Sequence, residues 1–400
     1  MNACGLVVEY NPFHYGHLHH LTKSKEIANA DCTIAVMSGN FLQRGEPAVI
    51  DKIHRTKAAL QAGADIVLEI PYAYTVQHSN HFATGAIHTL FEFGASSVCF
   101  GSESGDIHPF LNASKKLAQH QTLYKAYIDH YLKQGMNFPS ASAKACQELQ
   151  IHELDVTKPN NILGLSYVQA IREHHYPITP LTIKRIKNDY HDQTIASPIA
   201  SATSIREEFL SNGMSSKVRN TMPDSTLQAL ETYLTNSSVY HEWEAYFPLL
   251  QYQILAISKT ELRKIHGVDE GLENRIKRFT KQAVSFQHWI DLIKSKRYTI
   301  TRLQRMAVHI LTHTTKEEIN AFYTKSSVPY IRLLGLTEVG RSYFNKQKKK
   351  IELPVYTSLN RKNKQALALD EKVSSIYYQI VPPHKREALR QAEFNLPLLL

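Results

Sequence analysis

Short apolar runs alternate with helical stretches through the first half of the 400-residue chain. The expected strands are residues 6–8, 33–37, 65–70, 97–100 and 181–186. A helix is expected over residues 48–62, with Gly63 as its C-terminal cap. Because apolar strands separated by helices form parallel sheets covered on both faces, we predict an α/β fold. Ligands of such a sheet bind beyond the carboxyl ends of its strands.

The first apolar run is followed by a helix breaker and then by two histidines three residues apart. Asn11-Pro12 ends the run, because proline forces the residue before it out of the helical region. His14 and His17 then share one face of the helix that begins here, since residues i and i+3 are neighbours on a helix. The free N–H groups and the dipole of a helix N-terminus attract anions. The pattern therefore predicts a polyphosphate site rather than two unrelated surface histidines.

A second anion site is indicated at residues 199–208. Ser204 and Glu207 have the spacing of a capping box, which predicts that a helix begins here. Hydroxyl groups, free backbone N–H groups and Arg206 would then converge on an anion. A capping box by itself is common, so this segment indicates a site mainly in combination with the N-terminal histidines.

Positive charge is concentrated in the second half of the chain. The whole sequence has 46 Lys and Arg against 36 Asp and Glu, a formal net charge of +10. Residues 1–200 contain 16 basic and 17 acidic side chains, which leaves 30 basic and 19 acidic side chains for residues 201–400. A neutral catalytic half joined to a half that meets a polyanion would show this asymmetry, and a solvated basic surface would show it as well.

The run His14-Tyr15-Gly16-His17 resembles the HxGH motif of the nucleotidyltransferase superfamily. Residues 200–206 are similar to the Ser/Thr-rich motif with a trailing arginine that closes the ATP site in those enzymes. The resemblance implies a Rossmann-like sheet. It also implies that the histidines contact ATP phosphates and stabilise charge as pyrophosphate leaves, while the glycine lets adenine pack against the backbone.

Several longer segments resemble one family, the bacterial tRNA(Met) cytidine acetate ligases, and occur in the same order. They are residues 7–14, 37–47, 158–164 and 200–206, with further likeness in 298–305 and 330–335. The resemblance implies that acetate attacks the α-phosphate of ATP to give acetyl-adenylate and pyrophosphate. The N4 atom of the wobble cytidine (position 34) of elongator tRNA(Met) then takes the acetyl group. The acyl group and the tRNA species rest on the resemblance alone.

The resemblance also implies the residues of the site. His14, His17 and Arg206 are expected to be catalytic, Gly101 and either Asn160 or Asn161 to hold the nucleoside, and Arg185 to contact ATP or to orient the acetate. The residues expected to contact the nucleotide are Val7, Val8, Glu9, Tyr10, Asn11, Pro12, Phe13, His14, Tyr15, Gly16, His17, Leu18, His19, His20, Gly101, Asn160, Asn161, Arg185, Ser201, Thr203, Ser204 and Arg206. ATP is the expected co-substrate, accompanied by Mg²⁺, although no pair of carboxylates identifies magnesium ligands.

We expect two domains: residues 1–210, which bind ATP and catalyse, and residues 211–400, which are mainly helical and basic and bind tRNA. One amphipathic helix in the second domain, at residues 301–311, places Arg302, Arg305 and His309 on one face. Arginine stripes of this kind suit RNA phosphates, although a solvated face is the common alternative.

Composition and cysteine spacing argue against a membrane protein, a secreted protein and a protein with a structural metal. No apolar run reaches the roughly 18–20 residues that span a bilayer, and no secretory signal is visible at the N-terminus. The four cysteines have no metal-ligand spacing and read as small buried apolar residues, so we expect a cytoplasmic protein without a structural metal. Neither a membrane nor DNA is expected as a partner.

Two other functions fit parts of the sequence. A cofactor adenylyltransferase, acting on pantetheine phosphate or nicotinamide mononucleotide, uses similar motifs but leaves the basic half without a role. A non-catalytic tRNA-binding protein with a vestigial nucleotide pocket would keep its tRNA affinity without the histidines. A class I aminoacyl-tRNA synthetase is disfavoured, since no editing or anticodon module stands out.

Overall fold

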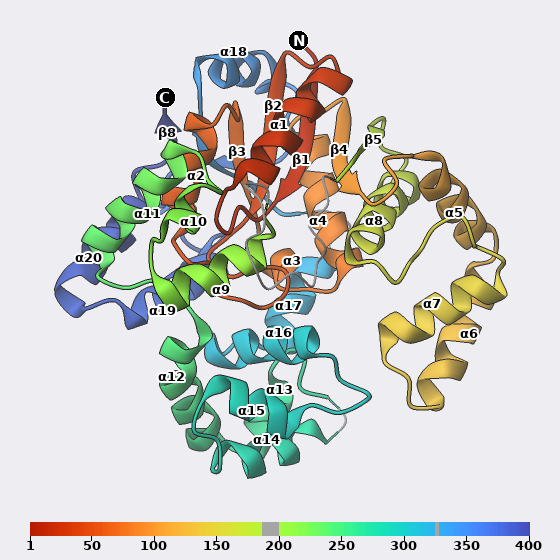
Figure 1. Ribbon diagram of the computed structural model, residues 1–400, viewed down its shortest axis with the longest axis vertical. Coiled ribbons are helices and arrows are strands. Elements are labelled where there is room, and N and C mark those ends of the chain that lie inside the picture. The colour runs from red at the N-terminus through yellow and green to blue at the C-terminus, as the bar shows by residue number, and fades with distance from the viewer. Residues whose placement is uncertain (186–199, 270, 325–327) are drawn as a thin grey trace.

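One mixed sheet runs through the protein, and the computed structural model describes residues 1–185, 200–269, 271–324 and 328–400. The strand order is β5-β4-β1-β2-β3-β6-β7, and β8 pairs with β6 outside this path (Figure 1). The strands are β1 (Ala3–Val8), β2 (Cys32–Ser38), β3 (Ile66–Ile70), β4 (Ser97–Ser102), β5 (Thr179–Lys184), β6 (Ile331–Leu336), β7 (Val355–Tyr356) and β8 (Leu398–Leu399). All five expected strands are therefore present, although Ile186, the expected end of the fifth, lies outside the described residues.

The sheet is mainly parallel rather than wholly parallel. Strands β1 to β5 are parallel to their neighbours, but β6 pairs with β3 in the antiparallel direction, with Glu69 opposite Arg332. Strand β6 belongs to the second half of the chain, which was expected to be mainly helical. The division at residue 210 stays a prediction, and it would cut the chain within one sheet.

Helices cover both faces of the sheet, as the apolar strands predict. On one face, Leu21 of α1 and Leu60 of α2 pack against β1, β2 and β3. On the other face, Leu90 of α4 lies so close to Gly5 of β1 that a Cβ atom on Gly5 would be 2.5 Å from it. The first eight helices are α1 (Tyr15–Ile27), α2 (Lys52–Gln61), α3 (Tyr72–Thr75), α4 (Ser79–Glu92), α5 (His108–Gln119), α6 (Gln121–Lys133), α7 (Phe138–Glu148) and α8 (Pro159–Glu173).

Apart from β6, β7 and β8, the described part of the second half is largely helical. None of the described helices is both long and apolar enough to cross a membrane. The helices are α9 (Ala202–Asn212), α10 (Ser216–Arg219), α11 (Asp224–Ser237), α12 (Trp243–Ala256), α13 (Lys259–Lys264), α14 (Leu272–Thr280), α15 (Phe286–Ile293), α16 (Ile300–Leu311), α17 (Lys316–Tyr323), α18 (Glu338–Gln347), α19 (Ala368–Tyr377), η1 (Tyr378–Ile380) and α20 (Pro383–Ala392).

Helix α2 begins four residues later than the sequence pattern predicts. Asp51 is its N-cap, because the carboxylate accepts the N–H of His54 at 2.8 Å. The buried guanidinium of Arg55 then donates to the backbone carbonyls of Glu9 and Gly39, among others. These carbonyls follow β1 and β2, so α2 fixes the carboxyl ends of two neighbouring strands.

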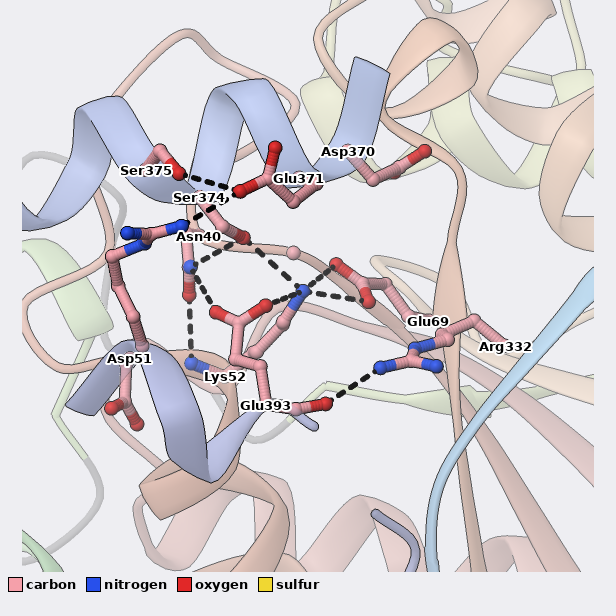
Figure 2. Close-up of polar contacts among 12 residues, drawn as sticks. Asn40, Asp51, Lys52, Glu69, Arg332, Asp370, Glu371, Ser374, Ser375 and Glu393 are labelled. Atoms are coloured by element: carbon pink, nitrogen blue, oxygen red, sulfur yellow. Dashed lines mark hydrogen bonds and ion pairs between the residues drawn. The ribbon is translucent and has the colours of Figure 1, made fainter. Parts of the chain in front are cut away.

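A buried cluster of charged side chains joins the last helices to the sheet. Lys52 of α2 lies 2.9 Å from a carboxylate oxygen of Glu69 on β3 and 2.9 Å from one of Glu393 after α20 (Figure 2). Asn40 donates to Glu393 and Ser374, and Arg332 donates to the backbone carbonyl of Glu393. Burial acts to lower the pKa of Lys52, but Glu393 and Glu69 outweigh it and hold that pKa above its usual value.

Buried neutral histidines make the fold sensitive to acid. Burial lowers the pKa of His14 and His241 to about 3 and that of His20 to about 4. Below about pH 6.5 the unfolded chain binds protons that the folded chain does not, so stability falls as the pH drops through this range. Each such histidine contributes a loss of about 1.4 kcal/mol per pH unit. His54 opposes the trend, because Asp51 outweighs burial and raises its pKa.

We expect the free energy of unfolding, measured with urea, to be lower at pH 5.5 than at pH 7. The side chain of His241 lies between the hydroxyl groups of Tyr233 and Tyr246, 2.5 Å from each. The variant His241→Phe lowers stability at both pH values but flattens its dependence on pH. An unchanged pH dependence in this variant would contradict the assignment.

Candidate active site

The chain turns at the carboxyl end of β1 and begins helix α1 with a histidine. His14 is the N-cap, and its Nδ1 accepts the N–H of Gly16 at 3.0 Å. Three residues on, the Nδ1 of His17 accepts the N–H of His14 at 3.4 Å. The two rings stack with their centroids 3.8 Å apart. The prediction that both histidines lie together at a helix start is confirmed.

These contacts fix the tautomer of both rings. Because each Nδ1 accepts a backbone N–H, the proton of the neutral imidazole is on Nε2. Burial lowers the pKa of His14 to about 3, with a contribution from the charges of Arg185 and Arg206, and burial also holds the pKa of His17 well below its usual value. The pair therefore presents neutral Nε2–H donors at neutral pH.

Helix α9 forms a second wall, and its cap differs from the predicted one. The helix begins at Ala202, because the Oγ of Ser201 accepts the N–H of Ser204 at 3.1 Å. Ser204 is not the cap: it is buried, and its hydroxyl donates to the carbonyl of Ser201 at 3.0 Å. Serine is a common N-cap residue, so the sequence offers both Ser201 and Ser204 as caps. Ser201 is the cap because it has the extended backbone that this position needs.

Arg206 connects helix α9 to the turn after β1. Its guanidinium donates to the carbonyl of Asn11 at 3.0 Å and pairs with Glu46 at 2.8 Å. An arginine next to the helix start adds charge to the free N–H groups there. The predicted convergence of α9 and the N-terminal histidines on one space is confirmed.

A third wall comes from β4, β5 and the start of α8. Arg185, directly after β5, donates to the side-chain oxygen of Asn160 at 2.8 Å, and Asn160 donates in turn to Glu103 at 3.0 Å. A Cβ atom on Gly101 would be 3.0 Å from the side chain of Arg185, so glycine leaves room for that side chain. Asn161 faces away, and its amide donates to the carbonyl of Asp155.

These walls enclose a cavity of about 280 Å³ beyond the carboxyl ends of β1, β4 and β5. The predicted residues that border it are Val7, Val8, Glu9, His14, Gly16, His17, His19, His20, Gly101, Asn160, Arg185, Ser201, Thr203 and Arg206. The predicted residues that do not border it are Tyr10, Asn11, Pro12, Phe13, Tyr15, Leu18, Asn161 and Ser204. A continuous run of sequence cannot face one cavity along its whole length, because a turn and a helix point side chains in several directions.

The residues that do not border the cavity support those that do. The rings of Tyr10 and Phe13 pack edge-on or tilted against His17, with centroids 5.1 Å and 5.8 Å from it. Asn11 accepts the N–H of Val49 through its side chain and a bond from Arg206 through its carbonyl. Tyr10, Phe13 and Asn11 therefore position residues that border the cavity.

Sequence reasoning assigned no role to several cavity residues. Gln43, Arg44 and Glu46 lie in the segment 37–47 that carries the family resemblance, which was the available signal. Leu163, Ala200 and Ala202 likewise lie in the segments 158–164 and 200–206. The remaining missed residues are apolar or aromatic and read as core: Phe82, Phe100, Tyr167 and Ile183.

The cavity offers few groups for a metal ion. Among the residues that the structure describes, no group of three or more His, Cys, Asp or Glu is arranged to hold one. Glu9 accepts the N–H of Gln43, and Glu46 pairs with Arg206. Among the described residues, the two carboxylates that border the cavity thus already have partners.

One member of the predicted arginine stripe on α16 is part of the core. His309 is 1 % exposed, and it contacts the hydroxyl of Tyr72 and the carbonyl of Val76. Helix α16 packs against α12 and α15, and in Figure 1 it lies below α3, whose Tyr72 meets His309, so position i+7 from Arg302 is covered. Only Arg302 and Arg305 remain candidates for RNA contact on this helix.

The fold and the cavity define a class of protein. The model of the HIGH Nucleotidyl Transferase family matches residues 1–393. Crystal structures of Thermotoga maritima TmcAL have the same fold along the whole of both chains, with a TM-score of 0.92 at 32% identity for the apo form I and 0.91 at 33% for the form bound with alpha-thio ATP.

Curated relatives identify the family within this class. The tRNA(Met) cytidine acetate ligase of Oceanobacillus iheyensis is 47% identical over 403 residues, which covers 100% of both chains. The Bacillus subtilis protein of the same name is 43% identical over 382 residues, or 94% of this chain and 92% of that one. The chain belongs to the tRNA(Met) cytidine acetate ligase family, as its motifs predicted.

Proposed function

We propose that this protein uses ATP to activate acetate and transfers the acetyl group to N4 of the wobble cytidine (position 34) of elongator tRNA(Met), giving N4-acetylcytidine. The observation that carries the proposal is the cavity in which His14, His17 and Arg206 converge, in a chain of this family. A Thermotoga maritima relative with the same fold has been crystallised with alpha-thio ATP.

In the first step a carboxylate oxygen of acetate attacks the α-phosphorus of ATP, and the bond from that phosphorus to the bridging oxygen breaks. Pyrophosphate leaves and acetyl-adenylate remains. His14 and His17 donate from Nε2 to the phosphate oxygens, and the N-terminus of α9 with Arg206 faces them. Fixed donors of this kind stabilise charge that develops as pyrophosphate departs.

In the second step N4 of cytidine attacks the acetyl carbon. The carbon–oxygen bond to the adenylate breaks, AMP leaves, and N4 loses a proton. An acyl-adenylate is already activated, so this step mainly requires positioning. Gly101 and Asn160 would hold the nucleoside of ATP, and Arg185, which Asn160 orients, would contact ATP or acetate.

The proposal also covers magnesium, the roles of the two halves of the chain and the location of the protein in the cell. Mg²⁺ would accompany the phosphates of ATP, because the two carboxylates that border the cavity, Glu9 and Glu46, already have partners. Residues 1–210 would catalyse and residues 211–400 would bind tRNA. The four cysteines are buried free thiols, which fits a cytoplasmic protein.

The test is acetate-dependent release of pyrophosphate from ATP, with and without bacterial tRNA, followed by digestion of the tRNA and a search for N4-acetylcytidine. Acetylated cytidine in tRNA supports the proposal. Pyrophosphate release stimulated by pantetheine phosphate or nicotinamide mononucleotide would indicate a cofactor adenylyltransferase instead. Binding of tRNA without any chemistry would indicate a binding protein.

Arg206→Gln should slow pyrophosphate release by about a hundred-fold, because it removes a cation that faces the phosphates. The matched control is Arg219→Gln. Arg219 also pairs with a glutamate, Glu231 at 2.9 Å, but does not border the cavity. Equal rates for the two variants would remove Arg206 from the catalytic group.

A further inference from the structure

The rim of the cavity is pressed against helix α16 of the basic half. Gly45, with a backbone φ of 79°, lies so close that a Cβ atom would be 2.3 Å from the backbone nitrogen of Arg305. The carbonyl of Gly45 also accepts a hydrogen bond from the indole of Trp243 at 2.8 Å. Arg44, the residue before Gly45, borders the cavity. This contact therefore brings Arg305 next to the ATP cavity, although Arg305 does not line it.

Positive charge gathers at this contact. Burial, together with the charges of Arg302 and Arg44, lowers the pKa of Arg305 to about 10. Burial lowers the pKa of His266 to about 4, and the charge of Arg305 contributes a small part of this decrease. Two more arginines thus surround a guanidinium that is partly withdrawn from water.

The acidic groups near this contact have partners other than Arg305. Asp269 lies 2.7 Å from Lys316 and 3.9 Å from Arg302, and Glu46 pairs with Arg206. Within the part of the chain that the structure describes, the guanidinium of Arg305 makes no hydrogen bond or ion pair. A guanidinium that is partly desolvated and lacks a carboxylate favours the approach of an anion, and its planar fork suits a phosphate.

The position of the cluster favours an RNA phosphate over a phosphate of ATP. His14, His17 and the start of α9 border the cavity, whereas Arg305 is outside it on the basic half. A base that enters the cavity has to leave its stack, which exposes the phosphodiesters on either side of its own nucleotide. These flanking phosphodiesters would then lie at the rim of the cavity, on the side of Arg305.

We propose that Arg305, together with Arg44, binds a phosphodiester of the tRNA chain next to the cytidine that enters the cavity. This inference rests on the proposed function, because it assigns the RNA contact of the same site. Arg305 thereby sets where the target nucleotide stands relative to the acetyl-adenylate.

The test compares Arg305→Gln with Arg341→Gln, which removes the same charge from exposed Arg341 on α18, at the opposite end of the molecule from α16 (Figure 1). The affinity for unmodified elongator tRNA(Met) is measured at several salt concentrations. We expect Arg305→Gln to weaken binding about ten-fold and to reduce the slope of log affinity against log salt by about 1. Arg341→Gln should bind like the wild type.

The affinity for ATP is measured on the same variants. A loss of ATP affinity as large as the loss of tRNA affinity would assign Arg305 to ATP and overturn the inference, as would tRNA binding equal to that of Arg341→Gln. If Arg305→Gln does not fold, Arg305→Lys replaces it. This variant keeps the charge but not the fork, so we expect several-fold weaker tRNA binding, and wild-type affinity would overturn the inference.

The role of Arg305 and the proposed function can be tested separately. If the wild type acetylates tRNA while Arg305→Gln binds tRNA normally, only the role of Arg305 is lost. If the wild type neither binds nor acetylates tRNA, the proposed function is lost and the role of Arg305 with it.

Discussion

His17→Asn should lower the rate of acetate-dependent pyrophosphate release by about 10²- to 10³-fold. The reason lies in the two ends of the imidazole ring. Nδ1 accepts the backbone N–H of His14, and Nε2 presents a proton to the cavity. An asparagine oxygen can replace Nδ1 as the acceptor, but its short side chain removes the donor at Nε2.

His17→Gln is the complementary variant, because the amide of glutamine reaches the position of Nε2 but leaves the N–H of His14 without its acceptor. We expect it to keep more activity than asparagine and to lower the free energy of unfolding by up to about 1 kcal/mol. Pyrophosphate release and urea unfolding are measured on both variants. Wild-type activity in His17→Asn would mean that His17 acts only by capping the helix, which would contradict its catalytic role.

Lys52→Met should lower the free energy of unfolding by about 3–5 kcal/mol, because it leaves buried carboxylates without a cation. Lys52 is 2 % exposed and lies between Glu69 and Glu393 in the cluster of Figure 2. A loss of this size is a large part of the stability of a typical protein. Urea unfolding at pH 7 measures it.

Lys57→Met is the matched control, since Lys57 is on the same helix but exposed. It should change stability by no more than about 0.5 kcal/mol. The double variant Lys52→Met/Glu69→Met should be more stable than Lys52→Met alone, because one unpaired carboxylate is gone. If Lys52→Met unfolds at the urea concentration of its control, the buried cluster does not hold the fold together.

The parts of the fold that the sequence predicts are those with local signals. The strands of the first half are short apolar runs with breakers after them, and the alternation of strands with helices specifies a parallel sheet. Strand β6 has the same kind of run but no such context. Its partner, β3, is more than 250 residues earlier in the chain, and no local pattern reports a contact over that distance.

The candidate site shows the same limit at the level of single residues. The pairing of His14 with His17 follows from helical spacing alone. The choice between Asn160 and Asn161, or between Ser201 and Ser204, depends on which neighbour points inward, and that direction is set by packing. His309 fits an arginine stripe by spacing, yet it contacts Tyr72 in the core.

The late arrival of β6 has a consequence for how the protein is made. A ribosome synthesises the parallel strands β1 to β5 first, and the edge of β3 then has no partner until residues 331–336 emerge. An open edge of an apolar strand is a template for pairing with other chains. We therefore expect chains that stop before β6 to aggregate during synthesis.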